Sequence, residues 1–313
     1  MFSFIQLEYI IALATYGNFK IASEHCFVTQ PTMSMQIKKM EQDLGVLLFD
    51  RSKQPVIATP VGQVVIDQAR IILSERDKLT EIVATHQNEI QGELHLGVIH
   101  SIAPFLLPLF IMELHQNYPQ LHVHVHEMIT EDLIQALRME TIDVAILVTP
   151  VDYKQIVTTP IYYEEIAVYV SPNHHFYSLE SIPEKLLDGE DMWMLREGHC
   201  FRDQTLNLCS NSQSSVKNKR FTFETGSIET LIKMVDLQGG YTLIPEMVIS
   251  NISPEKRDQI KWIEGEAKMR EVSIATYRNY AKIRLVKILE NSIQKTIPSR
   301  MLSRKSGQVV EWM

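Results

Sequence analysis

Through the first ninety residues, apolar positions recur every three or four residues, which predicts helices rather than strands. The first helical pattern ends at Gly17, and a second covers residues 19–25. A third begins after Thr29, a predicted N-cap, with Pro31 inside the first turn, and its apolar stripe runs to Gly45. The pattern therefore predicts a helix, a turn and a second helix in the arrangement of a small helical domain.

A longer helix is predicted next, because residues 65–90 contain neither proline nor glycine. Their apolar side chains alternate in steps of four and three, which is typical of a helix with a coiled-coil-like seam. The seam positions are Val65, Ala69, Ile72, Arg76, Leu79, Val83, His86 and Ile90. We expect this helix to link two domains and to pair with a second copy of the chain. The alternative is an ordinary helix packed on its own domain.

Beyond Gly92 the apolar pattern changes to alternation. Alternating or short buried strand patterns at 94–98, 121–125 and 143–148 are separated by helical stretches, of which the first covers 104–118. This order implies a parallel sheet with helical crossovers. Further strand patterns at 166–170, 192–195 and 241–244, with a helix at 228–237, predict a second α/β lobe. The last dozen residues are expected to form a frayed tail.

Composition narrows the class of protein. The 313 residues carry a net charge of -8, so any contact with DNA must come from a local patch. Three cysteines cannot form a secreted disulfide framework, and the first basic residue is Lys20, so we expect no signal segment and a cytoplasmic location. The apolar stretch 105–112 contains a proline and is far shorter than the roughly 20 residues of a membrane span. No Walker loop, Rossmann fingerprint, HExxH or GxSxG motif is present, so we expect neither an enzyme nor a cofactor.

The most specific motif runs from Ala22 to Arg51, with TQPTMSMQIKKMEQDLG at its centre. It resembles the helix-turn-helix signature of the LysR-type transcriptional regulators, and the resemblance extends over nearly the whole chain. It implies a winged helix-turn-helix at 1–60, a linker and dimerisation helix at 61–91, a two-lobed, periplasmic-binding-protein-like α/β effector domain at 92–300 and a tail at 301–313. The implied partners are promoter DNA, RNA polymerase and further copies of the chain in a dimer or tetramer.

DNA contacts are expected from the second helix of this motif and from the residues after it. Its first turns point Gln30, Thr32, Met33 and Gln36 toward base edges, and basic side chains reach phosphates. The full candidate set is Thr29, Gln30, Pro31, Thr32, Met33, Ser34, Gln36, Lys38, Arg51 and Lys53. Residues 1–60 hold five basic and five acidic side chains, so affinity requires two copies acting together. The alternative is a helical protein-interaction module.

A second motif, EGHCFRDQTLNLC, carries two cysteines, Cys200 and Cys209. His199 and Arg202 are expected to lower the pKa of the Cys200 thiol, and a thiolate near a second cysteine is the arrangement of a peroxide sensor. In a helix the two Cα atoms would lie about 13.5 Å apart along the axis, whereas a disulfide needs them within about 7 Å. Closing the bond must therefore rebuild the segment. The alternative is a pair of buried, unreactive thiols, the interpretation we favour for Cys26.

This second motif also resembles the redox segment of peroxide-responsive LysR-type regulators. The resemblance implies hydrogen peroxide as the signal, Cys200 as the oxidised residue and a disulfide to Cys209. It further implies a peroxide pocket made of Ser101, Thr130, His199, Arg202, Asp203 and Arg270. Two rival hypotheses remain open. One is a regulator whose effector is a small metabolite bound between the lobes, and the other is a thiol peroxidase or substrate-binding protein.

His122, His124 and His126 alternate along one predicted strand and share one of its faces. Three imidazoles on one face can hold a metal ion. The same pattern also fits a half-solvated strand or the edge of a dimer, and we expect no metal.

Overall fold

The computed structural model describes residues 2–86, 90–187, 191–209, 225–278, 282–303 and 307–312, without the side chains of 77 and 80–86. It contains two compact units. One comprises residues 1–89 with 279–283, and the other comprises 90–278 with 284–313. Within these ranges no helix is both long and apolar enough to cross a membrane.

The N-terminal unit is a winged helix-turn-helix, as the sequence predicts. Its elements are α1 (Phe4–Tyr16), α2 (Phe19–His25), α3 (Gln30–Leu44), the antiparallel pair β1 (Phe49–Asp50) and β2 (Ile57–Ala58), and α4 (Pro60–His86). The Ser3, Asn18 and Thr29 side chains cap the first three helices by accepting backbone N–H groups of the first turn. The β1–β2 hairpin is the wing.

The first half of α4 packs within its own unit. Ile66 and Ala69 are buried in the N-terminal core, and Val65 and Ile72 pack against it. For this half of the helix, the structure therefore agrees with the alternative of a helix packed on its own domain. Leu79 is different, because 66% of its surface is exposed. The side chains of Val83 and His86 lie outside the described part of the chain.

The C-terminal unit is built on one mixed sheet. Its strands are β3 (Gly92–Ile99), β4 (Leu121–Met128), β5 (Val144–Thr149), β6 (Ile156–Val170), β7 (Ser181–Ile182), β8 (Tyr241–Pro245), β9 (Ile260–Ile263), β10 (Ala267–Tyr277) and β11 (Gly307–Val309). The order is β4-β3-β5-β10-β6-β9-β7, with β8 paired to β6 and β11 paired to β10. The predicted parallel pairing is confirmed, since β3 runs parallel to both β4 and β5. The expected strand at 192–195 is reduced to a single bridge between Met192 and Tyr241.

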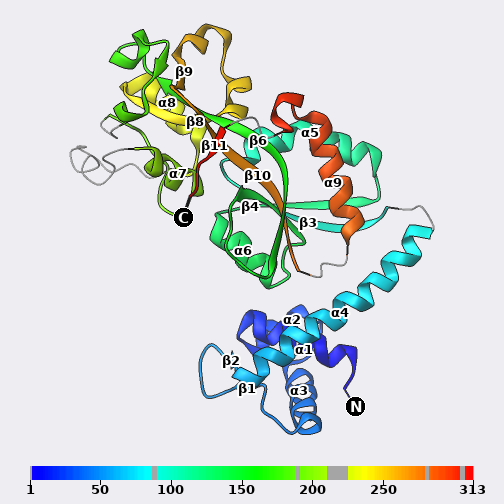
Figure 1. Ribbon diagram of the computed structural model, residues 1–313. Helices are drawn as coiled ribbons and strands as arrows, with labels where there is room; N and C mark the ends of the chain where they lie inside the picture. The colour runs from blue at the N-terminus through cyan, green and yellow to red at the C-terminus, as the bar shows by residue number, and fades with distance from the viewer. Residues whose placement is uncertain are drawn as a thin grey trace. The chain divides into compact units, whose positions relative to one another are not determined.

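Within the described residues of this unit, five longer helices and several short 3-10 turns accompany the sheet. The helices are α5 (Ala103–Asn117), α6 (Thr130–Arg138), α7 (Cys200–Leu208), α8 (Ile228–Gln238) and α9 (Ile283–Thr296), and the turns are His175–Ser178, Glu184–Leu186, Glu246–Asn251, Pro254–Gln259 and Ser299–Met301. Figure 1 shows α6 on one side of the β3–β4–β5 sheet and α5 and α9 on the other. The long strand β6 pairs with β10 in its first part and with β8 and β9 in its second, so it joins the two lobes.

The strand order creates a switch point at β3, because β4 lies on one side of it and β5 on the other. The chain leaves the carboxyl ends of β3 and β4 in different directions, toward α5 and α6. In open α/β sheets, such a point leaves a crevice where ligands bind.

Residues 307–312 pack against the C-terminal unit, so the expectation of a frayed tail is wrong for them. β11 pairs in parallel with Ala267–Met269 of β10, and Val310 and Trp312 are buried. The Trp312 indole N–H also donates to the Val148 carbonyl at 3.2 Å. Burial of the indole and pairing with β10 hold these residues in place. The local sequence does not indicate either contact.

We expect Trp312→Ala to lower the free energy of unfolding of the C-terminal unit by about 3 kcal/mol, because it leaves a large cavity. The matched control is Trp262→Ala, since Trp262 is 38% exposed. Urea titrations followed by circular dichroism measure both variants. If both substitutions lowered the free energy of unfolding equally, the buried Trp312 would stabilise the unit no more than the partly exposed Trp262.

Candidate functional site

Cys200 opens the redox-candidate helix α7 at the switch-point crevice. It is the first residue of that helix, follows the N-cap His199 and is only 3% exposed. Cys200 and Cys209 are both free thiols. The partial positive charge of a helix N-terminus favours a thiolate at this position.

Three of the residues expected in the pocket meet around Cys200. Thr130, the first residue of α6, lies close enough to the sulfur for its hydroxyl to lower the pKa of the thiol. Arg270 of β10 acts on the same thiol through its charge. The Arg270 Nη2 also donates to Ser101 Oγ at 3.1 Å. Residues that follow β3 and β4 are thus joined to β10 and α7, which belong to distant parts of the chain.

Arg270 is held by an ion pair that the sequence did not indicate. Its side chain is fully buried, and its Nε lies 3.2 Å from the Glu164 carboxylate, which is 1% exposed. The two residues are register partners on β10 and β6. The Arg270 guanidinium lies 5.0 Å from the Phe201 ring centroid, and Glu164 accepts the Met247 N–H at 3.1 Å. Burial raises the pKa of Glu164, and the charge of Arg270 opposes that shift.

Our expectation that His199 and Arg202 acidify the Cys200 thiol is wrong. Burial raises the pKa of Cys200, and the charge of Arg270 offsets this only in part. Burial, His100 and Arg196 lower the pKa of His199 from 6.5 to about 4, so its ring is neutral at pH 7. Arg202 Nη1 donates to the Leu195 carbonyl at 2.9 Å instead. The resting state of Cys200 is therefore the thiol, and Arg270 is the cation that favours its ionisation.

Asp203 also lies near Cys200, but its charge disfavours the thiolate. Its charge raises the pKa of the thiol, and burial raises the pKa of Asp203 itself. Asp203 and Arg202 thus shape the charge around α7 without promoting the thiolate.

Two residues lie beside His199 that the sequence did not indicate as part of the site. The rings of His100 and His199 meet edge to face with centroids 5.1 Å apart. Arg196 Nε donates to His199 Nε2 at 3.3 Å, which requires that nitrogen to carry a lone pair. His100 could have been found because it precedes Ser101 in the chain. Arg196 gave no such signal.

Several buried polar atoms in this region point to a small polar ligand. Within the described ranges, His100 Nδ1, Thr130 Oγ1 and Arg270 Nη1 have no hydrogen-bond partner. Buried polar groups are nearly always paired. A molecule with donor and acceptor oxygens would satisfy them beside the Cys200 sulfur.

Cys209 caps the far end of α7 and is 8% exposed. The intervening residues are helical, so the two cysteines are separated by about 13.5 Å along the axis. Two bonds hold the helix to the C-terminal segment, from Gln204 Nε2 to the Val310 carbonyl (2.7 Å) and from Asn207 Nδ2 to the Glu311 carbonyl (2.8 Å). Bringing the cysteines together requires α7 to unwind.

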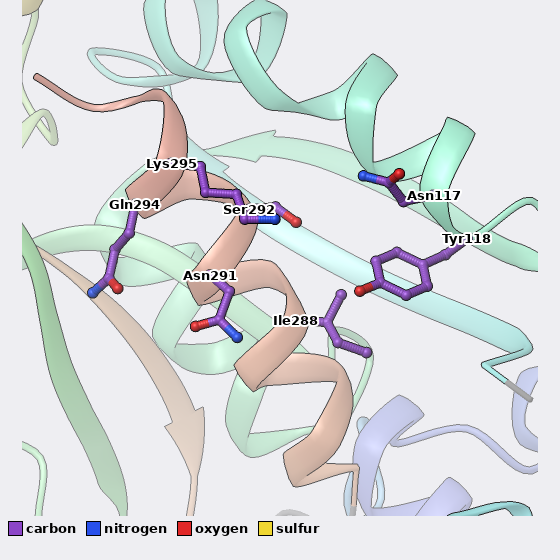
Figure 2. A pocket seen from close by; sticks show the side chains of 7 residues that line it. All are labelled: Asn117, Tyr118, Ile288, Asn291, Ser292, Gln294 and Lys295. Atoms are coloured by element: carbon purple, nitrogen blue, oxygen red, sulfur yellow. The ribbon is translucent and has the colours of Figure 1, made fainter. Parts of the chain in front are cut away.

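A separate pocket of about 340 Å³ lies on helices α5 and α9. Figure 2 shows its lining of Asn117, Tyr118, Ile288, Asn291, Ser292, Gln294 and Lys295. None of these residues belongs to the Cys200 site. The pocket therefore adds no group to the thiol chemistry.

In the N-terminal unit, the structure supports part of the candidate DNA-binding set. Gln30, Pro31, Lys38 and Lys53 are exposed, and the exposed Thr29 hydroxyl contacts that of Thr32 at 2.9 Å. Ser34 and Gln36 are half-buried, and the Gln36 side-chain oxygen accepts from Gln6 Nε2 at 3.1 Å.

Two residues of that set have structural roles. Met33 is fully buried in the core, so the expectation that it faces base edges is wrong. Arg51 forms a 2.7 Å ion pair with the buried Glu41 and lies 5.3 Å from the Phe19 ring centroid. Met35, which the sequence did not indicate as a DNA-binding candidate, is 63% exposed on α3.

The winged helix-turn-helix and the two-lobed unit with its switch-point crevice define a DNA-binding regulator with an effector domain. Residues 4–63 match the bacterial regulatory helix-turn-helix protein model of the lysR family, and residues 87–295 match the LysR substrate binding domain. The chain belongs to the LysR family of transcriptional regulators, which act by binding DNA and are not enzymes.

Within this family the chain is similar to regulators named for hydrogen peroxide. It is 35% identical over 250 residues to the hydrogen peroxide-inducible genes activator of Haemophilus influenzae, across 80% of this chain and 82% of the relative. It is also 35% identical over 258 residues to the DNA-binding transcriptional dual regulator OxyR of Escherichia coli K12, across 82% and 83% of the two chains. Full-length OxyR of Pseudomonas aeruginosa, solved as a cysteine variant, superposes with a TM-score of 0.77 at 31% identity, covering 95% of this chain and 99% of that one.

The lowered pKa of His199 predicts an acid-sensitive contribution to stability. The unfolded residue takes up a proton below about pH 6.5, whereas the folded residue does so only near pH 4. Its contribution is therefore complete above pH 6.5 and falls as the pH drops through this window. We expect His199→Gln to lose less stability between pH 7 and pH 4.5 than the wild type in urea titrations. The exposed His115→Gln should follow the wild type, and identical curves for all three proteins would contradict the assignment.

Proposed function

We propose that this chain is a peroxide-responsive transcription regulator in which hydrogen peroxide oxidises Cys200 and Cys209 then closes a disulfide. The observation that carries the proposal is the position of the Cys200 thiol, at a helix N-terminus and under the influence of Thr130 and Arg270. The name of the Haemophilus influenzae relative, a hydrogen peroxide-inducible genes activator, supports the same signal.

The chemistry balances in two steps. The Cys200 sulfur attacks one peroxide oxygen, the O–O bond breaks, and the departing hydroxide takes the thiol proton to leave as water, which gives a sulfenic acid. Arg270 stabilises the negative charge that develops on the sulfur and the departing oxygen. The Cys209 thiol then attacks the sulfenic sulfur, forming the disulfide and releasing a second water. Ser101 orients the guanidinium through its bond to Nη2.

The regulatory consequence follows from α7. Because a disulfide requires Cα atoms within about 7 Å, oxidation must unwind this helix and break its bonds to Val310 and Glu311. We propose that this rearrangement changes how copies of the chain associate on promoter DNA and engage RNA polymerase in the cytoplasm.

Mass spectrometry after stoichiometric peroxide tests the chemistry. We expect a peptide that links Cys200 to Cys209, lost again on reduction with dithiothreitol. An unmodified Cys200 with promoter binding that ignores peroxide would instead favour a regulator whose effector is a small metabolite. Sustained peroxide turnover without operator binding would favour a thiol peroxidase.

For the DNA-binding surface, we propose that Gln30 reads a base edge and Lys53 contacts a phosphate. Gln30→Ala should then relax sequence preference by roughly 1–3 kcal/mol at one base pair. Lys53→Ala should weaken binding to all sequences and reduce the salt slope by about one. Fluorescence anisotropy on a promoter fragment at several salt concentrations measures both. The control Lys233→Ala makes the same charge change on α8, and wild-type behaviour of all three variants would refute these contacts.

A further inference from the structure

A group of histidines on the neighbouring strands β3 and β4 is not used by the proposed redox chemistry. In the parallel register, His95 lies opposite His124, Glu93 opposite His122 and Gly97 opposite His126. Paired positions and alternate residues share one face of a sheet. Folding therefore brings Glu93 and His95 of one strand beside the histidines of the other.

The side chains in this group lie at distances suited to metal coordination. Within the described residues, one ligand atom each from Glu93, His95 and His124 lies within 4.8 Å of the others. His95 Nε2 and Glu93 Oε2 are 3.7 Å apart. In a tetrahedral zinc site with bonds of about 2.0–2.1 Å, ligand atoms are about 3.4 Å apart. Glu93 and His124 are exposed, so their side chains have room to rotate toward this geometry.

His126 supplies the partner that metal-binding histidines usually have. The His95 Nδ1 and the His126 Nε2 are 3.4 Å apart. When His95 Nδ1 donates its hydrogen to His126, the lone pair of His95 is on Nε2, the nitrogen that faces Glu93. A hydrogen bond from the second ring nitrogen fixes the tautomer and the orientation of a ligating imidazole.

The backbone beneath His95 is also fixed. Its N–H donates to the Asp143 carboxylate at 2.7 Å, and its carbonyl accepts from the Asp143 N–H at 2.8 Å. The His95 and His124 rings are stacked, with centroids 4.6 Å apart and planes 11° apart. His95 and His124 are therefore held on paired strands, not on loops.

The geometry points to a site for a divalent first-row transition-metal ion on β3 and β4, with Glu93, His95 and His124 as ligands and His126 orienting His95. Two imidazoles and one carboxylate suit Zn²⁺ and its neighbours in that row, and they do not suit Mg²⁺, which prefers oxygen ligands. The exposure of Glu93 and His124 leaves the remaining coordination positions to water. This site is separate from the Cys200 chemistry and stands without it.

A zinc titration against a chromophoric chelator tests the proposal with the full-length chain. We expect one Zn²⁺ per chain, bound equally well by a triple variant with Cys26, Cys200 and Cys209 all replaced by serine and unaffected by excess Mg²⁺. His95→Ala, His124→Ala and Glu93→Gln should each weaken binding at least about tenfold, and His126→Ala should do so through the orientation of His95. The matched control is His115→Ala, a solitary exposed histidine on α5.

A second measurement separates loss of the site from loss of the fold. Zn²⁺ should raise the thermal midpoint of the wild type and of His115→Ala but not that of His95→Ala, while the metal-free midpoints stay alike. Wild-type affinity in His95→Ala, or loss of binding in the triple cysteine variant, would overturn the proposal.

Discussion

Arg270→Met is expected to destabilise the C-terminal unit by about 3–5 kcal/mol, because it leaves the Glu164 carboxylate buried without its partner. The same substitution should slow oxidation of Cys200 by peroxide on the order of 10²-fold, as expected for loss of a preorganised group that stabilises developing charge. Urea titration measures the first effect. Stopped-flow oxidation, followed by quenching with a thiol-blocking reagent and mass spectrometry, measures the second.

A second substitution separates these two roles of Arg270. In the double variant Arg270→Met, Glu164→Gln the buried carboxylate becomes a neutral amide, so most of the lost stability should return. The oxidation rate should stay low, since the guanidinium near the sulfur is still absent. Wild-type oxidation by the double variant would mean that Arg270 only stabilises the fold.

Cys200→Ser is expected to abolish the response of promoter binding to peroxide, whereas Cys209→Ser should leave Cys200 oxidisable without a disulfide. The reason is the order of the two steps, in which only the thiol beside Arg270 meets the peroxide. Operator footprints of reduced and oxidised protein measure the response. A dimedone label on Cys200 should report the trapped sulfenic acid in the Cys209→Ser protein.

Cys26→Ser is the control for this pair, because Cys26 lies in the N-terminal unit and burial raises the pKa of its thiol. It should respond to peroxide as the wild type does. A Cys200→Ser protein whose footprint still changes with peroxide would place the sensing thiol elsewhere. Normal switching by Cys209→Ser would show that the sulfenic acid alone is the signal.

Local sequence determined the elements whose signals are local. The caps at Thr29 and Gly45 delimit α3, and the alternation after Gly92 predicted the parallel strands around β3. The paired cysteines marked the redox-candidate segment, and the structure shows that this segment is helical. In each case residues close in the sequence supply the hydrogen bonds or the periodicity, so the local sequence is enough to predict the element.

Tertiary packing decided the electrostatics and the burial. His199 and Arg202 stand beside Cys200 in the sequence, yet one is neutral and the other bonds the Leu195 carbonyl. The cation that acts on the thiol is Arg270, seventy residues further along the chain, and its partner Glu164 comes from another strand. Such shifts in pKa depend on burial and on charges brought close by folding, which no local pattern encodes.

The same distinction explains the other differences. Met33 has the helical position of a base-reading residue, but the core of the N-terminal unit needs its side chain. The last residues look like a tail, but β10 has an unfilled edge and Trp312 has an apolar site to bury in. The alternation of His122, His124 and His126 defined one face of a strand, and only the register with β3 placed Glu93 and His95 beside it. Sequence thus determined what each segment can form, and the contacts between distant segments decided which side chains meet.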